Sequence, residues 1–127
     1  MVEGKNLKVA GTLPRGPCQL RVLSMNIWDV PFLGTARKAR MEALGEALAN
    51  SEYDLCGLQE AWSPETQAML VKQAKSAGLV YSHTFVAGAD LPGGASGGGL
   101  LILSRYPIVN GAYLRDNRLR HVVRCGF

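Results

Sequence analysis

The stretch DLCGLQE, residues 54–60, decides the fold of this chain, because a short apolar run that ends in polar residues is typical of a strand inside a sheet. Such a run predicts a central strand of a sheet that is covered on both faces. The earlier stretch LRVLSMN, residues 20–26, alternates imperfectly and is rich in strand formers. It therefore predicts a second strand that is buried on at least one face.

Two helices are expected beside these strands. Residues 36–49 carry an apolar stripe at helical spacing, and Thr35 can cap this helix. The stripe consists of Met41, Leu44 and Leu48. The letters SPE at residues 63–65 begin the second helix, with serine at the N-cap, proline at the first helical position and an acid in the first turn. This helix should run to about residue 77 and stop at Gly78.

Further strands are expected after the second helix. Residues 81–87, 99–104 and 108–114 have the composition of strands, and the glycine-rich residues 88–99 indicate a long loop. The order strand, helix, strand, helix and then several strands predicts an α/β fold in which helices pack on a mixed sheet.

Composition limits the class of protein. The chain has 127 residues, of which 47% are hydrophobic and 19% charged, so it suffices for one globular domain and is not disordered. No apolar window of 18 residues indicates a transmembrane helix, and residues 1–18 read as a loose leader without the apolar region of a secretory signal. Three widely spaced cysteines favour free thiols in a reducing compartment, so a cytoplasmic location is expected.

The charge is distributed unevenly. The net charge of +4 first suggests an anionic partner. Residues 1–114 hold ten basic and nine acidic side chains, however, whereas residues 115–127 hold four arginines and one aspartate. Since a nucleic-acid reader needs basic side chains across its binding surface, this nearly neutral body makes nucleic acid the less favoured partner. The arginine-rich end lacks interleaved aromatic residues and is more simply explained as a solvated segment.

Asn26 and Glu60 stand at the ends of the two apolar strands. In layered α/β folds, functional groups gather at such strand ends. Amide and carboxylate oxygens are hard donors that suit Mg²⁺ or Ca²⁺, although two side chains do not fill a coordination shell. The structural alternative is that Asn26 satisfies a loop backbone and that Glu60 caps or pairs locally.

Other motifs give weaker indications. Residues 93–99 lack the lysine and the following helix of a phosphate-binding loop, so a flexible hairpin or strand entry explains them better. Lone histidines such as His83 and His121 are more often structural than catalytic. Trp28 and Trp62 each follow a candidate ligand by two residues, which fits either loop packing or the wall of a site, including a membrane-facing one.

The segments LRVLSMNIW (20–28), DLCGLQEAW (54–62) and GGGLLILSRYPI (97–108), in this order, resemble the endonuclease/exonuclease/phosphatase superfamily. Within that superfamily, NIWDVP at residues 26–31 and EAWS at residues 60–63 are most similar to neutral sphingomyelinases. The resemblance covers about residues 19–114. It implies the N-terminal half of a DNase I-like four-layer α/β sandwich.

The resemblance also implies hydrolysis of phosphoesters with Mg²⁺. Glu60 would be the metal-binding carboxylate, and Asn26 would lie beside it in the metal or phosphate shell, so both would be catalytic as well as metal-binding. The later motifs of the superfamily, which are a Thr-His pair, Gly-Asp-x-Asn and Ser-Asp-His, are not found in this sequence. The histidine base would then be missing. We therefore expect a partial domain over residues 19–114, a basic tail that departs from the family over residues 115–127, no activity of the chain alone, and an exposed sheet face.

The resemblance implies a phospholipid or another phosphoester as substrate, and peripheral association with a membrane surface. A nuclease or a phosphoinositide phosphatase of the same superfamily is the alternative within the enzyme class. A non-catalytic chain that binds a partner through its exposed sheet or basic tail is the alternative of a different class. The sequence leaves the natural substrate and the oligomeric state open.

Overall fold

A computed structural model describes residues 19–30, 36–84, 99–115 and 119–125, and beyond Val109 it describes the backbone alone. The elements in chain order are β1 (Val22–Asn26), α1 (Arg37–Ala49), β2 (Leu55–Gln59), α2 (Pro64–Ala74), the 3₁₀ helix η1 (Lys75–Ala77), β3 (Tyr81–Thr84), β4 (Leu100–Ser104), β5 (Ile108–Arg115) and β6 (Leu119–Cys125). The expected strands at residues 81–87 and 99–104 correspond to β3 and β4, although residues 85–98 lie outside the described part.

Four strands form one sheet in the order β1-β2-β4-β3. Strands β1 and β2 are parallel, with Asn26 opposite Gln59, and β4 runs antiparallel to both β2 and β3. The sheet is therefore mixed, and β2 is an inner strand, as the sequence predicts. Because β1 and β2 are parallel neighbours, their carboxyl ends meet at the same edge of the sheet.

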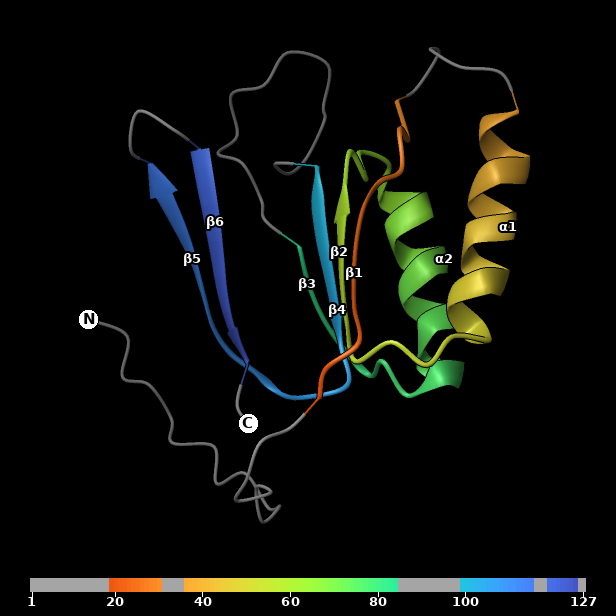
Figure 1. The fold of residues 1–127 in the computed structure, drawn as a ribbon. Coiled ribbons are helices and arrows are strands. Elements are labelled where there is room, and N and C mark those ends of the chain that lie inside the picture. Colours follow the sequence, from red (N-terminus) through yellow and green to blue (C-terminus); the bar gives the residue numbers. More distant parts are fainter. Residues whose placement is uncertain (1–18, 31–35, 85–98, 116–118, 126–127) are drawn as a thin grey trace.

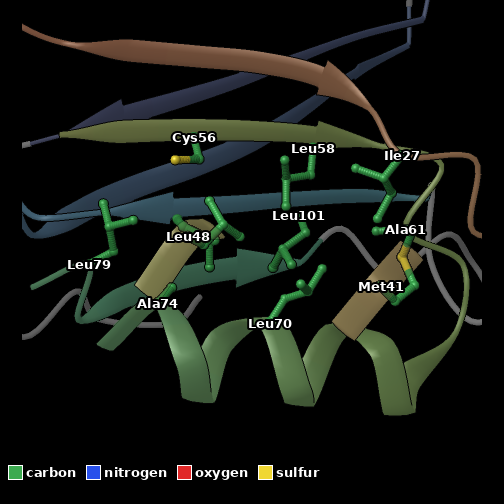
Figure 2. Close-up of a cluster of buried hydrophobic side chains, with 11 residues drawn as sticks. Ile27, Met41, Leu48, Cys56, Leu58, Ala61, Leu70, Ala74, Leu79 and Leu101 are labelled. Atoms are coloured by element: carbon green, nitrogen blue, oxygen red, sulfur yellow. The ribbon is translucent and has the colours of Figure 1, made fainter. Parts of the chain in front are cut away.

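Helices α1 and α2 cover one face of this sheet (Figure 1). Leu58 of β2, Leu101 of β4 and Leu70 of α2 are fully buried, and Figure 2 shows the two strand leucines pointing toward the helix. The apolar stripe predicted on α1 is confirmed, since Met41 and Leu48 are buried and Leu44 packs against the same core. The core therefore lies between the helices and the sheet.

The other face of the sheet is less well covered. Successive side chains along a strand point to opposite faces of the sheet. The pairing of the strands places Val22, Leu55 and Tyr81 on the face that points away from the core. Val22 is 61% and Tyr81 41% exposed, which agrees with the expected exposed face, and Leu55 is partly buried. Strand β2 itself is fully buried on the face that packs on the helices and partly buried on the other face, so the predicted coverage of both faces is complete only on the helix side.

The two helices begin differently. Ser63 caps α2 by accepting a hydrogen bond from the Thr66 backbone N–H at 3.3 Å, and η1 ends at Gly78 with a φ of 84°, both as predicted. Helix α1 instead has Ala36 at its N-cap, with a φ of 55° and no side-chain hydrogen bond. The expected cap, Thr35, lies outside the described residues. None of the helices in the described ranges is both long and apolar enough to cross a membrane.

Strands β5 and β6 form a separate antiparallel pair. Figure 1 shows this pair on the side of the four-stranded sheet that faces away from the helices. Strand β5 matches the expected strand at residues 108–114, but β6 falls in the arginine-rich end, for which no strand was expected. The domain boundary at residue 114 remains a prediction.

Candidate functional site

Asn26 and Glu60 lie side by side at the carboxyl ends of β1 and β2. Asn26 is the last residue of β1, and Glu60 follows β2 directly. The Asn26 Nδ2 group donates a hydrogen bond to Glu60 Oε1 at 2.7 Å, while Asn26 Oδ1 accepts one from the Trp28 backbone N–H at 2.9 Å. The amide therefore faces the carboxylate with its nitrogen, and both of its polar ends are paired.

The backbone around this pair is unusual. Glu60 has a φ of 57° and Trp28 a φ of 48°, so both residues adopt the left-handed conformation that only glycine adopts freely. Backbone hydrogen bonds hold the two turns together, because the Ile27 N–H donates to the Gln59 carbonyl at 2.9 Å and the Asp29 N–H donates to the Glu60 carbonyl at 3.0 Å. Residues kept in such strained conformations cluster at functional sites.

The Glu60 carboxylate has the chemistry to bind a hard divalent cation. Glu60 Oε2 has no hydrogen-bond partner among the described residues, so one carboxylate oxygen remains available. Mg²⁺ is commonly bound in proteins through one or two carboxylates and keeps several waters. No group of three or more His, Cys, Asp or Glu side chains that could hold a metal occurs within the described ranges. The Glu60 carboxylate could therefore supply part of a Mg²⁺ shell as its charged member.

The aromatic neighbours of the pair have different surroundings. Trp28 is 50% exposed, and the guanidinium of Arg40 lies over its ring at 5.3 Å from the centroid. Arg40 also donates to the backbone carbonyls of Ile27 and Trp28, each at 3.2 Å. Trp28 and Asn26 both line a cleft of about 700 Å³ between β1 and α1. Trp28 is thus part of the wall of a cleft that reaches Asn26, although Glu60 does not line this cleft.

Trp62 packs differently from Trp28. It is partly buried, and its indole ring lies against Gly99, where it would contact a side chain at that position. Gly99 has a φ of 64°, and its carbonyl accepts a hydrogen bond from the Ala61 N–H at 2.9 Å. These contacts favour the loop-packing interpretation of Trp62. The rest of the glycine-rich stretch, residues 93–98, lies outside the described residues.

The histidines are not brought to this site within the described part of the chain. His83 lies on β3, at the edge of the sheet opposite to β1, and pairs in register with Ile102 of β4. His121 lies on β6, where only the backbone is described. Among the described side chains, no histidine lies next to Glu60, where it could act as a base.

A buried aspartate next to the site was not singled out from the sequence. Asp29 is fully buried and accepts hydrogen bonds from Arg37 Nε at 2.5 Å, the Ser63 backbone N–H at 3.0 Å and Thr66 Oγ1 at 3.1 Å. Its position three residues after Asn26, in a segment rich in apolar residues, was the available signal. A buried charge needs such partners, which here come from the starts of two helices, Arg37 of α1 and Ser63 and Thr66 of α2.

The sequence of this chain is similar to those of known proteins. The sequence model of the Endonuclease/Exonuclease/phosphatase family matches residues 23–124. The chain is 37% identical over 91 residues to a putative neutral sphingomyelinase of Drosophila melanogaster, covering 72% of this chain and 19% of that protein. It is 38% identical over 91 residues to an inositol phosphosphingolipids phospholipase C of Schizosaccharomyces pombe, covering 72% and 20%. It is also 38% identical over 90 residues to sphingomyelin phosphodiesterase 2 of Rattus norvegicus, covering 71% and 20%.

Solved structures share the fold. A beta-hairpin deletion mutant of beta toxin from Staphylococcus aureus superposes with a TM-score of 0.56 at 18% identity, over 85% of this chain and 54% of that one. An endonuclease/exonuclease/phosphatase family protein from Leptotrichia buccalis gives 0.57 at 14% identity, over 83% and 47%. The chain spans about a fifth of the length of the curated relatives named above. The mixed sheet, the packed helices and the matched sequence together show that this chain belongs to the Endonuclease/Exonuclease/phosphatase family.

Proposed function

We propose that this chain supplies the Mg²⁺-holding part of a phosphodiesterase that acts on a phosphosphingolipid such as sphingomyelin. The observation that carries the proposal is the Glu60 carboxylate, fixed at the end of β2 by the Asn26 amide at 2.7 Å with one oxygen left available. The relatives that share this segment are sphingomyelinases and an inositol phosphosphingolipid phospholipase C, which supports a lipid phosphodiester as substrate. We place the activity in the cytoplasm, at membrane surfaces.

In this proposal each side chain has a defined task. Glu60 holds the cation through Oε2, because Oε1 already accepts from Asn26. Asn26 fixes the direction of that carboxylate and is itself fixed by the Trp28 backbone N–H. When bound, Mg²⁺ would polarise a phosphoryl oxygen and offset the charge that develops on it. The half-exposed ring of Trp28, backed by Arg40, offers an amphipathic surface of the kind found at membrane interfaces.

Hydrolysis also needs a base that activates water. The described side chains around Glu60 do not include a histidine, and His83 lies across the sheet on β3. We therefore propose that the chain alone binds the cation but does not hydrolyse substrate at an appreciable rate. The activity is therefore best tested in a relative that contains the remaining groups.

The experiment is a chimera in which the matching segment of this chain replaces its counterpart in the rat sphingomyelin phosphodiesterase 2, to which it is 38% identical. We expect Mg²⁺-dependent release of phosphocholine from sphingomyelin vesicles. Glu60→Gln should abolish that release. Glu52→Gln is the matched control, since it removes the same charge from an exposed residue that pairs with Arg21 before the start of β2.

A folded chimera that releases no phosphocholine, or that is unaffected by Glu60→Gln, would contradict the lipid proposal. Plasmid DNA and a phosphoinositide are assayed in parallel, and hydrolysis of either one in place of sphingomyelin would favour the nuclease or phosphatase alternative. Retention of a partner protein by the 127-residue chain, without any Mg²⁺ effect, would favour a non-catalytic role.

A further inference from the structure

We propose that Asp29 is a positioning residue that sets the direction of the Glu60 carboxylate. This inference rests on the proposed function, in which Glu60 holds Mg²⁺. Asp29 does not face the cleft as a ligand would, since it is fully buried. It acts through the backbone of the turn that carries Glu60.

The contacts of Asp29 enclose that turn from both ends. Its backbone N–H donates to the Glu60 carbonyl at 3.0 Å, and its carboxylate accepts from the Ser63 backbone N–H at 3.0 Å. Asp29 therefore holds both the first and the last residue of the segment from Glu60 to Ser63. Since Ser63 is the N-cap of α2, the same contacts also tie the turn to the start of that helix.

The turn needs such a constraint because of its backbone conformation. Glu60 has a φ of 57°, and Trp28, the residue before Asp29, has a φ of 48°. Left-handed conformations of residues with a Cβ persist only where the surroundings enforce them. If the Asp29 contacts were lost, both turns would be free to relax, and the Glu60 carboxylate would turn away from Asn26.

The carboxylate of Asp29 is itself held in place. Arg37 Nε donates to Oδ1 at 2.5 Å and Thr66 Oγ1 donates to the same oxygen at 3.1 Å, so helices α1 and α2 both contribute. Arg37 also reaches Thr66 Oγ1 at 3.4 Å. Outer residues of this kind, which orient a metal ligand, typically change metal affinity 10- to 100-fold when they are mutated.

Asp54 provides a matched comparison within the same chain. Its carboxylate also accepts from a backbone N–H, that of Arg21 at 2.9 Å, and from a guanidinium, Arg105 Nε at 3.2 Å. It lies just before β2, whereas Glu60 lies just after it. Asp54 therefore ties segments together with similar chemistry but at the end of the sheet away from Glu60.

The test compares Asp29→Asn and Asp54→Asn in the 127-residue chain. Two quantities are measured below the unfolding transition of each variant: the Kd for Mg²⁺ by titration calorimetry, and the NMR signals of the Asn26 side-chain amide without metal. We expect both variants to unfold at lower urea. Only Asp29→Asn should raise the Kd about 10-fold or more and move the Asn26 signals toward those of an amide that lacks the hydrogen bond to Glu60.

A further variant covers the case in which Asp29→Asn does not fold. Thr66→Val removes one donor to Asp29 but keeps every charge, and we expect it to shift the Kd and the Asn26 signals in the same direction by a smaller amount. Equal effects of Asp29→Asn and Asp54→Asn on the Kd, or Asn26 signals that Asp29→Asn leaves unchanged, would overturn the positioning role. If the unaltered chain binds no Mg²⁺ while Asp29→Asn alone moves the Asn26 signals, the proposed function is wrong and the positioning role is supported.

Discussion

Truncation of Leu58 tests the arrangement of the sheet and its helices. Leu58 is fully buried, and Figure 2 shows it within the core that the helices cover. Replacing an enclosed leucine by alanine removes its apolar contacts and leaves a cavity, which costs about 3–4 kcal/mol. Leu55 lies on the same strand but on the opposite face and is only partly buried. Leu55→Ala should therefore cost about 1 kcal/mol.

The assay is urea unfolding followed by circular dichroism. With a slope of about 2 kcal/mol per molar urea, Leu58→Ala should lower the midpoint by about 1.5–2 M and Leu55→Ala by about 0.5 M. The two variants remove the same atoms from one strand, so each controls for the other. Equal shifts, or a larger shift for Leu55→Ala, would refute the conclusion that the main core lies on the helix side of β2.

Three further predictions concern single contacts. Ser63→Ala should destabilise the chain by about 1 kcal/mol in urea unfolding through loss of the α2 cap, and it should raise the pKa of the Glu65 carboxyl in an NMR titration, because the Ser63 hydroxyl holds that pKa below its ordinary value. Gly99→Ala should lower the midpoint of thermal unfolding, since Gly99 has a φ of 64° and a Cβ there would lie 2.9 Å from Trp62. Burial raises the pKa of the Cys56 thiol from 9.0 to about 11, so peptide mapping after alkylation at pH 8 should find Cys56 unmodified until the chain unfolds. The folded state holds this proton more tightly, so the Cys56 contribution to stability should be complete below pH 9 and decline as the pH rises toward 11.

Local signals in the sequence predicted the elements that carry the candidate site. Strand β2 was predictable because its apolar run is short and ends in polar residues, and the start of α2 was predictable because serine, proline and an acid occupy its first positions. The location of Asn26 and Glu60 at strand ends followed from the same patterns. Their 2.7 Å hydrogen bond required the parallel pairing of β1 with β2, which the sequence patterns alone did not specify.

The features that could not be predicted depend on residues from other segments of the sequence, or on a strand whose alternation of apolar and polar residues is hidden. Strand β6 was missed because arginines interrupt its apolar residues, which hides the alternation. Asp29 was missed because a carboxylate in a loop is normally exposed, and its burial here depends on Arg37, Ser63 and Thr66, which belong to other segments. The prediction that Thr35 is the N-cap of α1 was wrong, because Ala36 occupies that position and offers no capping side chain.

We propose that Glu60, held by Asn26, is the residue through which this chain binds Mg²⁺. Titration calorimetry of Mg²⁺ into the 127-residue chain tests it most directly, with Glu60→Gln and the matched Glu52→Gln as variants. We expect saturable binding that Glu60→Gln abolishes or weakens at least 10-fold and that Glu52→Gln leaves unchanged. Binding that survives Glu60→Gln, or that both variants weaken equally, would contradict it.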